Sequence, residues 1–178
     1  MVAAPARRVV VIFPNAANTG AVEGFRARWD PLAAQVRAHI TLVFPFETDA
    51  AAADELRRSI AGVAARQAPF AIELVEPTIW EREYLFLLAR QGGAEIGRLH
   101  HALYDALPEA LKEGGFVPHM TIGRRQVPQE IEAAYHGARG LNLEVCGFAR
   151  ELTVYRIDPD GSRRAEVVVP LGKDPTGG

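Results

Sequence analysis

One strand pattern occurs twice in this chain of 178 residues, and it constrains the fold more than any other feature. The segments His39–Phe46 and His119–Arg124 both begin with His-x-Thr and continue with apolar residues. They lie almost half a chain length apart, and each has a helix-type segment before it and after it. A unit repeated at this spacing predicts two similar lobes related by a pseudo-twofold axis.

The rest of the chain mixes strand and helix patterns in an irregular order. Runs of β-branched and aromatic residues indicate strands, whereas apolar residues spaced three and four apart indicate helices. Because the order is not a strict strand–helix alternation, we expect an α+β fold. The expected strands are 7–13, 39–46 (ended by Pro45), 70–75, 84–89, 119–124, 143–148, 151–157 and 166–169, and the expected helices are 21–29, a short one opened by Asp30-Pro31, 48–67, 94–111 and 128–140.

The composition is that of a globular protein with little affinity for long polyanions. Apolar residues make up 48% of the chain and charged residues 24%, which favours a folded domain over disorder. We expect a single two-lobed domain over residues 1–172, with 173–178 as a C-terminal tail, and a monomer. The formal net charge of −2 argues against a grip on many phosphates, so any nucleic-acid contact should be short, such as a terminus or a nucleotide.

Cysteine content and hydropathy bear on the cellular setting. Cys146 is the only cysteine, so no disulfide can form within the chain, and a reducing, cytoplasmic setting is expected. We expect Cys146 to be a small buried hydrophobe. The apolar run 9–13 follows Arg7 and Arg8, but it is too short for a signal-peptide core or a membrane span, so no membrane partner is expected.

The two motifs place polar side chains on one face of each strand. Side chains alternate between the faces, so His39 and Thr41 point the same way, whereas Ile40 points the opposite way. The same alternation groups His119 with Thr121. Across a cleft, one neutral imidazole can accept a proton, one imidazolium can donate a proton, and the hydroxyls can stabilise charge on a phosphate. This set suits transfer at phosphorus with no metal ion and no cofactor.

Arg124 follows the second motif, and the sequence does not decide whether its side chain faces the cleft. A positive charge there would bind phosphate, yet strict alternation places Arg124 opposite His119 unless a bulge forms at Gly123. An exposed or structural ion pair is the alternative. In a regular strand, Gly123 itself would lie on the cleft face and leave room for a ligand.

The remaining histidines and several aromatic residues have weaker functional patterns. His100 and His101 diverge on a helix and are expected at the surface or its boundary, and His136 is expected in solvent. Three aromatic residues either pack in the core or stack a nucleobase, namely Trp80, Tyr84 and Phe86.

The two motif segments, HITLVFPF at 39–46 and PHMTIGR at 118–124, resemble the paired signatures of the two-histidine (2H) phosphoesterase superfamily, specifically its 2′-5′ RNA ligase-like branch. The segments 30–32 and 168–172 are also similar to that branch. The resemblance implies a bilobal α+β fold of antiparallel sheets with helices packed outside and the motifs lining a central cleft. It assigns catalysis to His39 and His119 and substrate binding to Thr41 and Thr121.

The resemblance also implies hydrolysis of a 2′,3′-cyclic phosphate on an RNA end or a nucleotide. In the expected mechanism His119 activates water and His39 protonates the departing 3′ oxygen, and the two roles can be reversed. One alternative is a 2′-5′ RNA ligase or 2′-5′ phosphodiesterase, which needs the same residues. Another is a non-catalytic module that binds a phosphorylated nucleotide. The pattern disfavours a metal-dependent phosphatase because carboxylate and cysteine partners are missing near the motifs.

Overall fold

The computed structural model describes residues 5–49, 51–107, 110 and 114–172. These residues form a mixed series of strands and helices, which confirms the expected α+β class. The strands are β1 (Ala6–Ile12), β2 (Ile40–Thr48), β3 (Phe70–Trp80), β4 (Tyr84–Gln91), β5 (His119–Arg124), β6 (Val145–Ala149), β7 (Glu151–Ile157) and β8 (Arg163–Pro170), and the helices are α1 (Thr19–Trp29), α2 (Ala53–Ala64), α3 (Gly93–Ala106) and α4 (Pro128–Gly140).

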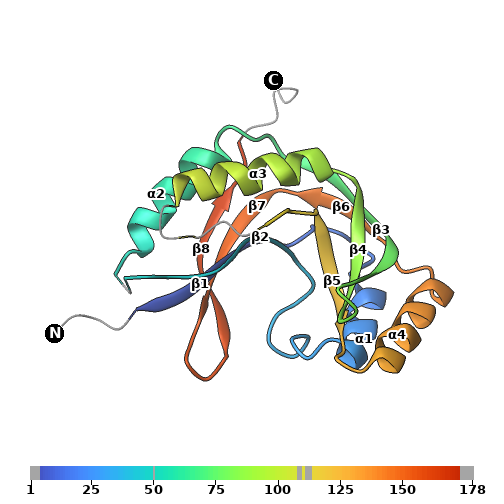
Figure 1. Cartoon of the computed structure of the whole chain (residues 1–178). Coiled ribbons are helices and arrows are strands. Elements are labelled where there is room, and N and C mark those ends of the chain that lie inside the picture. Colours follow the sequence, from blue (N-terminus) through green and yellow to red (C-terminus); the bar gives the residue numbers. More distant parts are fainter. Residues whose placement is uncertain (1–4, 50, 108–109, 111–113, 173–178) are drawn as a thin grey trace.

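Two four-stranded antiparallel sheets form the two lobes (Figure 1). The first sheet has the strand order β2-β1-β7-β8, and the second has the order β5-β4-β3-β6. The two motif strands, β2 and β5, are therefore edge strands, and they contact each other where the sheets meet. One cluster of buried apolar residues draws on both sheets and on α1 to α4, so the lobes share a core. The predicted bilobal arrangement is confirmed.

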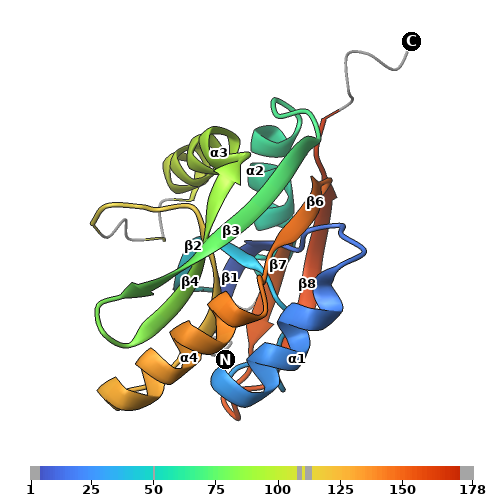
Figure 2. The ribbon, with the colours of Figure 1, turned by 90° about the vertical axis from the view of Figure 1, so that its right-hand side faces the viewer.

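Helices α1 and α3 cross from one lobe to the other. α1 follows β1 of the first sheet but packs against β5 of the second, and in Figure 2 it lies beside α4. α3 follows β4 of the second sheet and packs against β2 of the first. By contrast, α2 covers β7 and β8, and α4 covers β3 and β4. Each motif strand is thus backed by the helix that precedes the other motif.

Several element boundaries differ from the expected ones. β2 does not end at Pro45 but continues to Thr48. The register with β1 passes from Val10–Val43 to Arg8–Phe46, so β2 contains an extra residue there, and an edge strand with such a bulge tolerates proline. The expected short helix at 30–31 is wrong, because residues 31–35 form consecutive turns. β3 extends to Trp80, and α2 begins only at Ala53.

Two expectations concern the ends of the described ranges. The helix expected over 94–111 ends at Ala106, and residues 108–109 and 111 lie outside the described residues, as does the expected tail at 173–178. In the described part of the chain, no helix has both the length and the hydropathy that membrane crossing requires.

Candidate active site

His39 lies immediately before β2, at the edge of the first sheet. Its Nδ1 is 2.8 Å from the carbonyl oxygen of Arg37, two residues earlier. The ring of Phe13 packs edge-on against the imidazole, with 6.0 Å between the ring centroids. Burial disfavours the charged ring and lowers the pKa of His39 to about 4. His39 is therefore neutral at pH 7.

His119 is the first residue of β5, at the edge of the second sheet. Its Nδ1 is 2.6 Å from the carbonyl oxygen of Val117, again two residues earlier. The imidazole stacks on Phe86 with 3.7 Å between the ring centroids and an angle of 20° between the planes. Burial lowers the pKa of His119 as well.

The two histidines share one hydrogen-bond arrangement and therefore one tautomer. A carbonyl oxygen only accepts, so Nδ1 of each ring carries the hydrogen and donates it to the backbone. Nε2 is then the proton acceptor of each neutral ring and becomes a donor when the ring is protonated. The same atom of both imidazoles is thus available for proton transfer.

The two threonines lie on the same faces as the histidines. Residues directly opposite one another in a sheet share a face, and Thr121 is opposite Phe86, the ring that stacks on His119. In the first sheet Thr41 is opposite Val11, which shares a small apolar cluster with Phe13, the neighbour of His39. We call these two surfaces the histidine faces. The alternation expected within both motifs is confirmed.

A bulge in β5 brings Arg124 onto the histidine face of the second sheet. The register passes from Phe86–Thr121 to Leu85–Gly123, so β5 contains one extra residue at this point. Arg124 is opposite Tyr84, and its guanidinium lies 5.1 Å from the centre of that ring. The bulge that Arg124 requires to lie on the same face as Thr121 is therefore present. Arg124 also makes the alternative contact, an ion pair of 2.5 Å with Glu83.

The same bulge turns Gly123 away from the histidine face. A Cβ atom at Gly123 would lie 3.4 Å from the Cβ of Trp29 in α1. The expected position of Gly123 in the cleft is therefore wrong, since regular alternation breaks at the bulge. Its missing side chain lets α1 approach β5 closely.

Aromatic rings extend along the histidine face of the second sheet. Phe86 is buried beneath His119, and the Trp80 ring stacks on Phe86 with 5.9 Å between centroids and 24° between planes. Tyr84 lies 5.9 Å from Phe86 on the same face. Trp80 is 39% exposed, so it retains an open ring surface, whereas Phe86 has the packing role.

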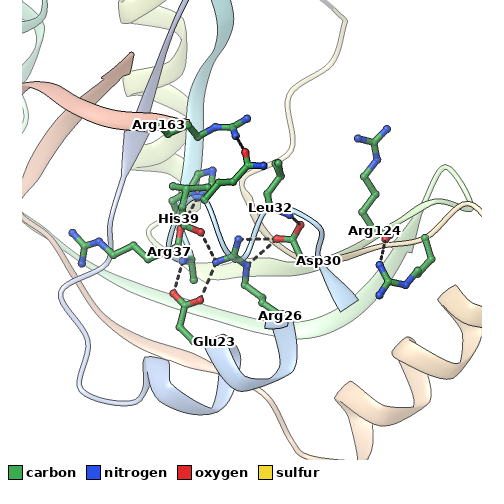
Figure 3. A network of polar contacts seen from close by, with 12 residues as sticks. Glu23, Arg26, Asp30, Leu32, Arg37, His39, Arg124 and Arg163 are labelled. Atoms are coloured by element: carbon green, nitrogen blue, oxygen red, sulfur yellow. Dashed lines mark hydrogen bonds and ion pairs between the residues drawn. The ribbon is translucent and has the colours of Figure 1, made fainter. Parts of the chain in front are cut away.

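Charged residues from α1 and the following turns surround the first motif (Figure 3). The charge of Arg26 lowers the pKa of His39, and that of Asp30 raises it. The hydrogen bond to Glu83 is the main cause that raises the pKa of Arg124, and the Asp30 carboxylate adds to it. Arg26 and Asp30 were not expected at the site, although their spacing of four residues is the spacing of ion pairs on a helix face.

Other residues singled out by the sequence lie elsewhere. His100 is buried rather than at the surface, its Nδ1 is 2.8 Å from the carbonyl oxygen of Leu42, and its ring stacks on Phe116 at 3.8 Å. It therefore closes the open edge of β2 just beyond Thr41. His101 and His136 are exposed, as expected. Cys146 is exposed on β6, so its expected burial is wrong.

Metal-ligand patterns give no candidate centre. Among the described residues, no group of three or more His, Cys, Asp or Glu side chains is arranged to hold an ion.

The chain is similar to a known family over most of its length. A family model described as the 2′-5′ RNA ligase superfamily matches residues 13–161. A protein of Geobacillus kaustophilus, provisionally named a phosphoesterase, is 30% identical over 116 residues, which are 65% of this chain and 67% of that protein. A protein of Bacillus cereus with the same provisional name is 29% identical over the same shares of the two chains.

Solved structures share the fold at lower identity. The LigT protein of E. coli, solved with 3′-AMP, is 20% identical and superposes with a TM-score of 0.62 over 94% of this chain and 99% of LigT. The LigT structure with phosphate gives a TM-score of 0.62 at 21% identity, over 95% of this chain and 99% of LigT. These likenesses show the fold.

Proposed function

Because the chain belongs to the 2′-5′ RNA ligase superfamily, we propose that it is a phosphodiesterase that opens 2′,3′-cyclic phosphates on RNA ends or nucleotides by histidine acid–base catalysis. One observation carries the proposal. The two motif strands are edge strands in contact, and one imidazole lies immediately before β2 and the other at the first residue of β5. Nδ1 of each ring donates to a backbone carbonyl, so Nε2 is the nitrogen that can take part in proton transfer. Binding alone does not require this matched pair.

In the proposed reaction, His39 acts as the base and His119 as the acid. Nε2 of neutral His39 takes a proton from water as the water oxygen bonds to phosphorus. The bond from phosphorus to the 3′ oxygen breaks, and His119 gives that oxygen its proton, leaving a 2′-phosphate. The low pKa of His39 favours this order over the reverse order first expected from the sequence. The anionic phosphate favours the charged form of the acid.

The remaining side chains of the histidine faces suit a nucleotide. In the proposed complex, Thr41 and Thr121 donate hydroxyl hydrogen bonds to the non-bridging phosphate oxygens, and Arg124 balances their charge. Their positions on the histidine faces support these roles. The exposed Trp80 ring offers a surface on which a base can stack. LigT, which shares the fold, has been solved with 3′-AMP and with ATP.

Cleavage or joining of 2′-5′ linkages is the second candidate within the same site. It would use the same two imidazoles and differ in the leaving group, so only the product distinguishes the two reactions. A non-catalytic nucleotide-binding module would use the hydroxyls and Arg124 but would not require the proton-transfer atoms.

Incubation of the protein with 2′,3′-cyclic nucleotides in excess chelator tests the proposal. Phosphorus NMR should show a 2′-phosphate, and His39→Ala and His119→Ala should each lower kcat by about 100-fold or more, because general acid–base groups contribute roughly 10²–10⁴ in rate. A parallel reaction with a 2′-5′-linked dinucleotide tests the second candidate.

His136→Ala is the matched control, because His136 is an exposed histidine on α4. It should retain full activity. Turnover that survives in both motif variants would exclude the two-histidine scheme, and turnover that depends on a metal ion would favour a different class of phosphatase.

A further inference from the structure

A buried arginine of α1 holds the segment that leads into His39 (Figure 3). Arg26 is only 1% exposed. Its Nε and Nη2 donate to one carboxylate oxygen of Asp30 at 2.9 and 2.7 Å, and its Nη1 donates to Glu23 at 3.0 Å. Nη1 also donates to the backbone carbonyl of Val36 at 3.1 Å. One guanidinium thus joins two acids of the helix region to the chain ahead of the motif.

The carboxylates of Asp30 and Glu23 also accept hydrogen bonds from the backbone of segment 31–38. Asp30 accepts a hydrogen bond from the backbone N–H of Leu32 at 3.0 Å. Glu23 accepts one from the backbone N–H of Ala38 at 2.5 Å. The contacts at Val36 and Ala38 lie on either side of residue 37, whose carbonyl oxygen accepts the hydrogen of His39 Nδ1.

Two open pockets border this segment on the α1 side. A cavity of about 380 Å³ borders Glu23, Arg37 and Ala38, and another of about 400 Å³ borders Asp30 and Pro31. Neither of these two cavities is lined by His39 or His119. Val36 and Ala38 are buried in the apolar clusters, and the polar contacts of Glu23 and Arg26 add to this packing at the same two residues.

The second motif is held differently. The segment before His119 is fixed by the main chain, because the carbonyl oxygen of Pro118 accepts from the backbone N–H of Ala89 in β4. His39 lies outside its strand and relies on side chains of α1 for the corresponding support.

We infer that Glu23, Arg26 and Asp30 are positioning residues for His39: they fix the Arg37 carbonyl and thereby hold the imidazole in its Nδ1–H tautomer. Only the effect on turnover rests on the proposed function, because the tautomer is a property of the free protein. Glu23 is the residue to vary, since a third of its side chain is exposed and its loss costs the fold least.

Glu23→Ala should shift His39 partly to the Nε2–H tautomer, which nitrogen-15 NMR of the imidazole rings measures directly. It should lower kcat about 10- to 100-fold with KM changed less than about twofold, because small displacements of catalytic groups have effects of that size. Glu23→Gln retains an oxygen that accepts from Ala38, so it should restore the tautomer and most of kcat.

Glu166→Ala is the matched control. Glu166 pairs with the fully buried Arg8 at 2.5 Å in the same sheet, and Arg8 alternates with Val9 in β1, so it points away from the histidine face. This variant should lower Tm without changing the His39 tautomer. The His119 ring serves as an internal reference in every variant.

The inference is overturned if the His39 tautomer is unchanged in Glu23→Ala, or if the His39 and His119 rings change equally, which would indicate general loosening. A tautomer shift in a protein that lacks cyclic phosphodiesterase activity would support the positioning role while rejecting the proposed function.

Discussion

The two motif histidines share a tautomer but differ in the charges around them. Burial lowers the pKa of both rings and a backbone carbonyl raises it, but the charges of Arg26, Asp30 and Arg163 act on the pKa of His39 in addition. The two histidines therefore have the same backbone hydrogen bond but different electrostatic surroundings. Such an asymmetry suits a reaction in which one ring must be neutral when the other is charged.

We predict that kcat/KM for a cyclic phosphate is maximal below neutral pH, between about 4 and 6.5. This parameter reports ionisations of the free protein. The base His39 is lost only as pH falls through about 4, and the acid His119 loses its proton as pH rises through a pKa below 6.5. Rates at low substrate concentration over this range test the prediction. His39→Ala should remove the acidic limb from whatever rate remains, and a wild-type maximum at or above pH 7 would contradict the assignment.

At the scale of elements, the bulge in β5 determines which side chains of the second motif lie on the histidine face. Without the extra residue, Gly123 would face the ligand and Arg124 would point toward α1. With the extra residue, Gly123 packs against Trp29 of α1, and Arg124 lies on the same face as Thr121. The bulge therefore links helix packing on one side of the strand to charge on the other.

Arg124→Ala should raise KM for a cyclic nucleotide by roughly 10- to 100-fold, because a hydrogen bond to a charged group is worth about 1.5–3 kcal/mol. Glu83→Ala removes the ion pair of Arg124 but leaves its charge free for substrate, so KM should not rise. Steady-state kinetics of the two variants provide the measurement. Equal behaviour of both variants would mean that Arg124 serves only the ion pair.

Alternation and periodicity predicted the strands that carry the motifs, and they predicted the bounds of β5 and of the following helix α4 to the residue. They could not predict the bulge, because it depends on how β5 registers with β4. They also could not predict the burial of His100, because a histidine on a helix gives no apolar signal and its contacts with Leu42 and Phe116 are distant in sequence. The charges at Glu23, Arg26 and Asp30 are typical of a solvated helix face, but in the folded chain Arg26 and Asp30 are buried and Arg26 contacts segment 31–38.

For the whole molecule, the exchange of α1 and α3 between lobes means that neither half of the chain contains a complete lobe. The first half lacks the helix that covers β2, and the second half lacks the helix that covers β5. Contacts of this kind are long in sequence, and the shared core joins both sheets. We therefore expect the two lobes to unfold together.

Separate fragments 1–81 and 82–178 should each lack a cooperative unfolding transition, and an equimolar mixture should regain one together with activity. The break falls in the exposed turn between β3 and β4, where Glu81 and Arg82 adopt positive φ, so it disturbs few contacts. Thermal melts followed by circular dichroism provide the measurement. Independent folding of either fragment would show that the crossed helices are dispensable.

Helix α1 contacts both motifs at once. Its Trp29 packs beneath Gly123 of β5, and its Glu23 and Arg26 hold the chain that enters His39. A substitution that displaces α1 would therefore disturb the surroundings of both catalytic candidates at once, although they belong to different sheets.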